Sequence, residues 1–258
     1  MTADNQGMLG RRAAEKSSNA MRDPSAPRLF TWKVVVLLVA CVLGYLGLWA
    51  AIEAADGGVL AIDEAAYRAI SLGLRSDAMT LFMRGVSFLG TGKAVTVMII
   101  IVLIVVRAKR TALYCAASAI GIHYLNALLK DLACRPRPDE ALRLIAATGW
   151  SFPSGHAMNA VVLLGLLAWF VWQSDLPRRT RLVLCTVLGA VAALVCISRV
   201  YLGVHYLSDV LAGACAAGAW LVLFTRLVLV IERALAKRGA DGGAAGQGES
   251  ADANVSQR

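Results

Sequence analysis

Long apolar runs, separated by short polar and basic stretches, form the main pattern of this chain. Five of these runs have about the length that crosses the hydrocarbon core of a bilayer, and they cover residues 34–52, 111–129, 155–174, 182–197 and 210–231. A sixth run, residues 94–106, is short for a span, so we expect its helix to start before Lys93. The pattern predicts an all-α fold, a polytopic membrane bundle of six transmembrane helices.

The stretch between the first two spans has a different pattern. Residues 53–77 mix polar and apolar residues with a slight excess of acidic ones, and residues 62–70 have the spacing of a short amphipathic helix. We expect this helical segment on the outer surface. Residues 79–92 are apolar but interrupted by Arg84 and several glycines, which favours a position along the membrane interface.

Composition and charge agree with a membrane protein. Hydrophobic residues make up 58% of the chain, above the usual share in soluble domains. The formal charge is +9, but Lys and Arg gather in the two tails and in the connections 107–110 and 178–181. The positive-inside rule explains this distribution with both termini in the cytoplasm, so nucleic-acid binding is not expected.

Three regions follow along the chain. Residues 1–30 are predicted to be a flexible cytoplasmic tail, residues 31–235 the six-span domain, and residues 236–258 a disordered cytoplasmic tail rich in Gly, Ala, Ser and Asp. The six cysteines form no CxxC pair and mostly fall inside apolar runs, as small buried hydrophobic residues do. A disulfide between Cys134 and Cys196 stays open.

One outer connection departs from the charge rule, because its basic residues lie on the side that topology disfavours. An anion is expected to meet them there. The ammonium group of Lys130 and the planar guanidinium of Arg137 are suited to binding phosphate oxygens. The alternative interpretation is an ordinary basic helix end. The basic residues of this connection are Lys130, Arg135, Arg137 and Arg143.

The next motif is Ser-Phe-Pro-Ser-Gly-His at 151–156, which opens an apolar helix. A helix N-terminus of this kind binds anions through its free N–H groups. Ser154 can cap the helix or donate to a phosphate oxygen, and Gly155 lets the backbone approach closely. His156 can give a proton to a leaving oxygen, the alternative being an interfacial histidine.

A third polar stretch, residues 198–209, follows the fifth span. On a helix, His205 and Asp209 share one face, so the carboxylate can fix which ring nitrogen is free. Such a pair builds a nucleophilic histidine, and Arg199 can hold phosphate oxygens beside it. The alternative is a membrane-edge loop with ordinary polar residues.

Together these residues resemble the three-part signature of the type 2 phosphatidic acid phosphatase superfamily, whose catalytic core is similar to that of vanadium haloperoxidases. The resemblance covers residues 34–233 and implies that His205 attacks phosphorus, Asp209 orients its ring, and His156 protonates the leaving oxygen. The residues implied to hold the phosphate are Lys130, Arg137, Ser154, Gly155 and Arg199. Arg135 is ambiguous, since it also precedes a proline but its distance from Lys130 misses the motif.

The resemblance implies a metal-independent, cofactor-free lipid phosphate phosphatase with its site on the outer face of a bacterial cytoplasmic membrane. Its partners would be the bilayer and a lipid phosphate, with undecaprenyl pyrophosphate as first choice and phosphatidylglycerophosphate or phosphatidic acid next. A phosphotransferase of the same family is the nearest alternative. A lipid flippase or transporter is a second alternative, but it would need charged residues at mid-membrane depth, whereas here they lie near one face. Haloperoxidase chemistry is a third, but those proteins are soluble and this chain has six predicted spans.

Overall fold

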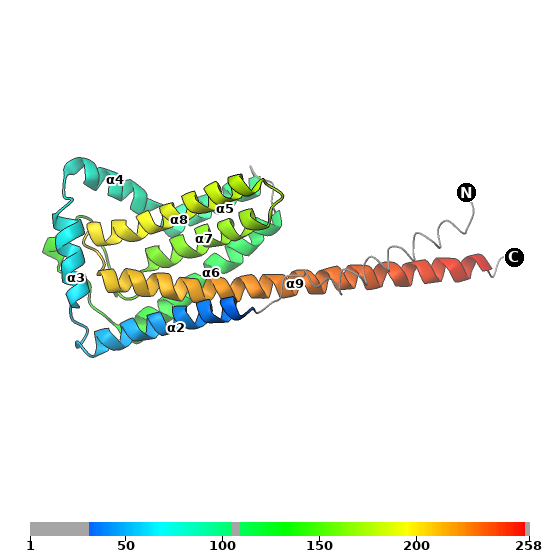
Figure 1. Cartoon of the computed structure of the whole chain (residues 1–258), viewed down its shortest axis with the longest axis horizontal. Helices are drawn as coiled ribbons and strands as arrows, with labels where there is room; N and C mark the ends of the chain where they lie inside the picture. Colours follow the sequence, from blue (N-terminus) through cyan, green and yellow to red (C-terminus); the bar gives the residue numbers. More distant parts are fainter. Residues whose placement is uncertain (1–30, 105–108, 256–258) are drawn as a thin grey trace. The chain divides into compact units, whose positions relative to one another are not determined.

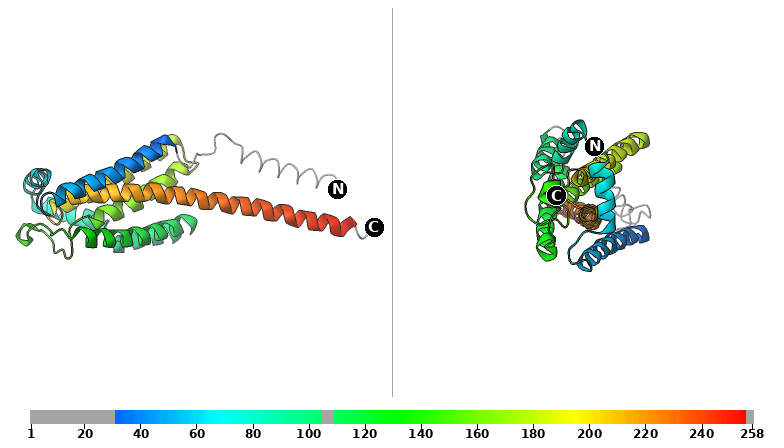
Figure 2. Two further views of the ribbon diagram at one scale, coloured as in Figure 1. Left: turned by 90° about the horizontal axis from the view of Figure 1, so that it is seen from below. Right: turned by 90° about the vertical axis from the view of Figure 1, so that its left-hand side faces the viewer.

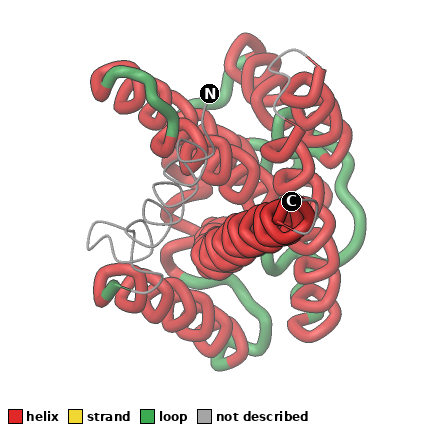
Figure 3. The backbone as a smooth tube through the Cα atoms, turned by 90° about the vertical axis from the view of Figure 1, so that its right-hand side faces the viewer, coloured by secondary structure: helices red, strands yellow, loops and turns green. Residues whose placement is uncertain are grey.

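The computed structural model describes residues 31–104 and 109–255, with side chains as far as residue 235. Over that part of the chain the elements are helices joined by loops, without a strand (Figure 3), which confirms the predicted all-α fold. The elements are α2 (Trp32–Glu53), α3 (Ala61–Ala66), a π-helical turn η1 (Tyr67–Leu72), α4 (Asp77–Phe88), α5 (Gly92–Ile104), α6 (Lys109–Ala133), a 3₁₀ turn η2 (Glu140–Leu142), α7 (Gly155–Gln173), α8 (Arg178–Tyr201) and α9 (Leu207–Val255). The predicted tail over residues 1–30 lies outside the described residues.

Five helices, α2, α6, α7, α8 and the Leu207–Leu235 part of α9, are long and apolar enough to cross a membrane. The bent pair α4 and α5, whose axes meet at 59°, supplies the sixth crossing if it is counted as one broken span. The predicted six-span bundle is therefore confirmed, with its second span broken.

The break lies at residues 89–91, where the chain packs tightly against α7 and α8. A Cβ atom on Gly90 would come within 3.0 Å of Cβ of His156 and 2.9 Å of Cγ1 of Val195. A larger residue would push the connection away from both helices. As expected, α5 starts before Lys93, but only by one residue, and the preceding apolar stretch forms the separate helix α4.

Residues 33–224 form one compact unit, and the described residues from 225 onward belong to a second. Helix α9 begins in the first unit and ends in the second. Its composition predicts disorder after residue 235, whereas the backbone is helical to Val255.

One end of the unit of residues 33–224 gathers the segments with the predicted chemistry. At this end α6 and α8 finish, α7 and α9 begin, and α3 lies across the helix ends (Figures 1 and 2). A core that includes Tyr45, Ile122, Phe152 and Met158 packs beneath them. The first turns of α7 and α9 are joined directly, since the N–H of Ser154 donates to the carbonyl of Asp209 at 3.0 Å.

Candidate active site

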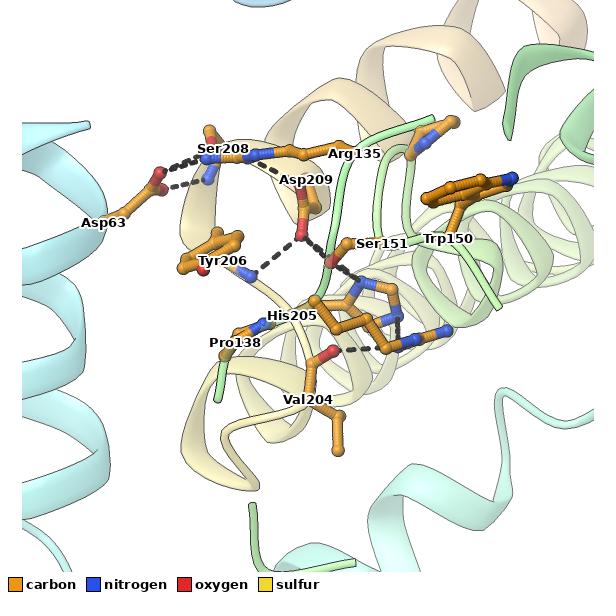
Figure 4. Close-up of polar contacts among 12 residues, drawn as sticks. Asp63, Arg135, Pro138, Trp150, Ser151, Val204, His205, Tyr206, Ser208 and Asp209 are labelled. Carbon is orange, nitrogen blue, oxygen red and sulfur yellow. Dashed lines mark hydrogen bonds and ion pairs between the residues drawn. The ribbon is translucent and has the colours of Figure 1, made fainter. Parts of the chain in front are cut away.

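His205 lies in the turn between α8 and α9, and Asp209 lies in the first turn of α9. Nδ1 of His205 is 3.4 Å from Oδ2 of Asp209, with both side chains buried (Figure 4). On the other edge of the ring, Nη1 of Arg137 is 3.1 Å from Nε2. A guanidinium only donates, so Nε2 accepts and the ring proton sits on Nδ1, facing Asp209. Nε2 is therefore the nitrogen with a lone pair.

Burial decides the charge of this histidine. It lowers the pKa of His205 to about 4, and the hydrogen bond and charge of Asp209 offset only part of that effect. The imidazole is neutral at pH 7 as a result. A neutral, oriented imidazole can act as a nucleophile.

Asp209 is held in one orientation by donors on both carboxylate oxygens (Figure 4). Oδ2 accepts from Ser151 Oγ at 2.5 Å and from the backbone N–H of Tyr206 at 2.9 Å. Oδ1 accepts from Arg135 at 2.7 Å. Charge-assisted bonds of this kind keep the carboxylate ionised beside the ring.

The structure resolves the ambiguity between the two arginines of the first motif. Arg135 is fully buried and bridges Asp209 and Asp63, at 2.7 and 3.0 Å. Its guanidinium also lies 4.2 Å over the ring centre of Tyr206. Every side of Arg135 therefore faces protein, whereas Arg137 reaches Nε2 of His205.

Three cations converge beside the histidine from different segments. Lys130, at the end of α6, donates to the carbonyls of Trp150 and Ser151. Arg199, in the last turn of α8, is 4% exposed and donates through Nη1 to Ser87 of α4, while its Nε has no partner. The charges of Lys130, Arg137 and Arg199 repel one another. An arrangement of this kind favours a bound anion.

The start of α7 contributes the remaining predicted residues. Ser154 occupies the N-cap position, but its buried Oγ makes no hydrogen bond. Gly155 is needed for packing, because a Cβ there would come within 2.8 Å of Oδ1 of Asn126. His156 follows in the first turn and interacts electrostatically with Arg199 and His205. A helix N-terminus with an unused hydroxyl suits phosphate oxygens.

All the residues predicted for the site thus come together at one end of the bundle: His156, His205 and Asp209 with Lys130, Arg137, Ser154, Gly155 and Arg199. Sequence reasoning missed Asp63, Ser87, Ser151 and Ser208. Ser151 and Ser208 stood inside the stretches 151–156 and 198–209 that the sequence singled out. Asp63 and Ser87 come from α3 and α4, far away in the chain, so no local spacing predicts them.

Two further expectations concern cysteines and metals. The six cysteines are free thiols, so Cys134 and Cys196 do not form the disulfide that the sequence left open. Within residues 31–104 and 109–255, no group of three or more His, Cys, Asp or Glu side chains is placed to hold a metal ion.

Comparisons with known proteins agree with the motifs. The pattern of the PAP2 superfamily matches residues 108–233. Phosphatidylglycerophosphatase B of Bacillus subtilis (strain 168) is 34% identical over 180 residues, which are 68% of this chain and 86% of that protein. Decaprenylphosphoryl-5-phosphoribose phosphatase of Mycobacterium tuberculosis is 37% identical over 116 residues, 44% of this chain and 58% of that protein. The crystal structure of a transmembrane PAP2-type phosphatidylglycerolphosphate phosphatase from Bacillus subtilis is similar with a TM-score of 0.66 at 32% identity, over 75% of this chain and 96% of that one.

Proposed function

The chain belongs to the PAP2 superfamily, and on that premise we propose that it hydrolyses a lipid phosphate through a phosphohistidine at His205. One observation carries this proposal. Nε2 of His205 is held with its lone pair toward Arg137, while Asp209 holds the opposite edge of the ring. A nucleophile placed at a cluster of cations is what phosphoryl transfer requires.

In the first step, Nε2 of His205 forms a bond to phosphorus as the bond from phosphorus to the lipid oxygen breaks. The negative charge of the bound phosphate lets His156 take up a proton when substrate binds, and His156 gives this proton to the leaving oxygen. Because Arg137 now donates to Nε2, its guanidinium must release the ring when the phosphoryl group arrives and turn to the phosphoryl oxygens. The ring becomes positively charged, and the carboxylate of Asp209 stabilises this charge.

In the second step, water attacks the phosphohistidine and His156 takes its proton back from that water. The bond between nitrogen and phosphorus breaks, and the electron pair returns to Nε2. Lys130, Arg199 and the start of α7 hold the oxygens as their charge increases in both transition states. These charges come from the protein alone, so we expect EDTA to leave the rate unchanged.

For the substrate, we propose phosphatidylglycerophosphate first. The relative that this chain covers over 86% of its length is named for that lipid phosphate, which supports ranking it ahead of undecaprenyl pyrophosphate. A polyprenyl-linked substrate is second, supported by the decaprenylphosphoryl relative. We also propose that the site faces the outside of a bacterial cytoplasmic membrane, with both termini inside, since this orientation satisfies the positive-inside rule.

A phosphate-release panel tests the proposal. Detergent-solubilised protein is given phosphatidylglycerophosphate, phosphatidic acid and undecaprenyl pyrophosphate, with and without EDTA, and vanadate is added as a mimic of pentacoordinate phosphorus. We expect the fastest release from phosphatidylglycerophosphate, competitive inhibition by vanadate and no release by His205→Ala. His123→Ala is the matched control, because His123 lies on the exposed face of α6 and should turn over normally. Normal turnover by His205→Ala would rule out the mechanism.

A further inference from the structure

Helix α3 carries an acidic residue that the family motifs do not contain. Asp63 is 2% exposed and lies outside residues 108–233, which the family pattern matches. Its carboxylate accepts from the backbone N–H and the hydroxyl of Ser208, both at 2.8 Å, and from Arg135 at 3.0 Å. The neighbouring Glu64 is exposed and pairs with the likewise exposed Arg68 of η1. One acid of α3 is thus built into the interior, while its neighbour faces outward.

Arg135 connects this acid to the nucleophile. Its Nη1 donates to Asp209 and to Ser208, each at 2.7 Å, and its Nη2 donates to Asp63 at 3.0 Å (Figure 4). Nη2 also donates to the carbonyl of Gly58 at 2.6 Å, and Nε donates to the carbonyl of Gly57 at 3.4 Å. All of these bonds are to protein groups. Arg135 therefore has no donor in reserve for a phosphate.

The three buried charged groups, Asp63, Arg135 and Asp209, do not cancel to zero net charge. Asp63 and Asp209 are each negative and Arg135 is positive, so the group presents one net negative charge to His205. Without Asp63 the guanidinium would neutralise Asp209. Inside a protein such charges act more strongly than in water, because little solvent screens them.

We propose that Asp63 and Arg135 are positioning residues for the nucleophile. Arg135 fixes the carboxylate of Asp209, and Asp63 offsets the charge of Arg135, so that Asp209 can stabilise the positive ring that forms with the phosphohistidine. This inference rests on the proposed function. The other charged or titratable groups that face His205 are Arg137 of the α6–α7 connection, Arg199 of α8 and His156 of α7. They lie on the phosphate side and are not bonded to Asp63.

Asp63→Asn tests the proposal, because it keeps the size of the side chain and removes its charge. We expect kcat to fall about 10–100-fold, the loss that follows replacement of a residue that orients a metal ligand through a hydrogen bond, because Asp63 acts on Asp209 in the same indirect way. KM should stay within about twofold, because Lys130, Arg137 and Arg199 are untouched. Glu64→Gln is the matched control and should keep both constants.

The pH profile separates charge from loosened packing. Loss of the Asp63 charge makes the protonated ring less favourable, so the acid limb of kcat/KM should move to lower pH in Asp63→Asn. A site that merely opened to water would regain solvation, and its limb would move up toward the ordinary histidine range. Ser208→Ala removes the hydroxyl that bonds Asp63 and Arg135 without changing a charge, so it should lower kcat by less, about 3–10-fold, and leave the limb in place.

Each outcome has one meaning. Normal kcat in Asp63→Asn, an upward shift of the limb, or an equal loss in Glu64→Gln would overturn the positioning role. If Asp63→Asn does not elute from a size-exclusion column as a folded protein, a normal kcat in Ser208→Ala would overturn the positioning role instead. Failure of the unmodified protein to release phosphate from any lipid of the panel would overturn the proposed function itself, which is a separate result.

Discussion

The two halves of the site differ in how completely the protein satisfies them. On the nucleophile side, Asp209 has donors on both oxygens and Arg135 is fully engaged by protein groups. On the phosphate side, Oγ of Ser154 and Nε of Arg199 are buried without a partner. A buried polar group without a hydrogen bond destabilises the folded protein, by about 1–3 kcal/mol.

This difference reflects what each half must do. The nucleophile must point one way before substrate arrives, so its supports are made by the protein and are present from the start. In the proposed mechanism, the two unpartnered groups of the phosphate side, Oγ of Ser154 and Nε of Arg199, are available for oxygens that come with the lipid. The predictions below test this contrast, starting with the largest effect.

Among these predictions, Asp209→Asn should cause the largest loss of activity. An amide cannot stabilise the charged ring, and it can turn its N–H₂ toward Nδ1 and so favour the wrong tautomer. We expect kcat to fall about 10³–10⁴-fold, as for the aspartate of other catalytic triads, with little change in substrate binding. Steady-state phosphate release measures this, and a loss below about tenfold would contradict the assigned role.

Two serines allow a direct comparison of the halves. Ser154→Ala removes an unpartnered hydroxyl, so the free energy of unfolding should stay equal or rise by up to about 1 kcal/mol. The same change should lower kcat/KM by about 10–100-fold, because a donor to the phosphate is lost.

Ser151→Ala removes a hydroxyl bonded to Asp209, so stability should fall by about 1–2 kcal/mol together with activity. Unfolding in mixed micelles and phosphate release on the same preparations give both values. Equal stability changes in the two variants would remove the contrast between the halves.

The smallest expected effect is a pH dependence of stability. The folded pKa of His205 lies near 4, below its ordinary value of 6.5, so the unfolded chain binds more protons between these values. Stability from this group is complete above pH 6.5 and is lost as the pH falls. Between pH 6.5 and 5.5 the loss should be about 1 kcal/mol. His205→Gln should show a flatter dependence over that range, and an unchanged slope would contradict the buried neutral ring.

The sequence predicted the spans and the motif residues well because both are local signals. A span needs only an uninterrupted apolar length, and the bounds of α2, α6, α7 and α8 follow the predicted runs closely. His205 and Asp209 are only four residues apart, so the turn that leads into α9 brings them together, although His205 lies before the helix begins and not on its face as predicted. The break between α4 and α5 was less clear, because Gly90 is required by contacts with His156 and Val195, which lie far along the chain.

The amino-acid sequence by itself determined the membrane bundle and the residues able to carry phosphoryl transfer. Only the tertiary structure decided which arginine serves which partner. Arg135 and Arg137 stand two residues apart before prolines, yet one is enclosed with Asp63 and Asp209 and the other reaches Nε2 of His205. Arg135 and Asp63 are 72 positions apart, and pairing across such a distance leaves no periodicity in the sequence, because it arises only when α3 folds across the ends of the spanning helices.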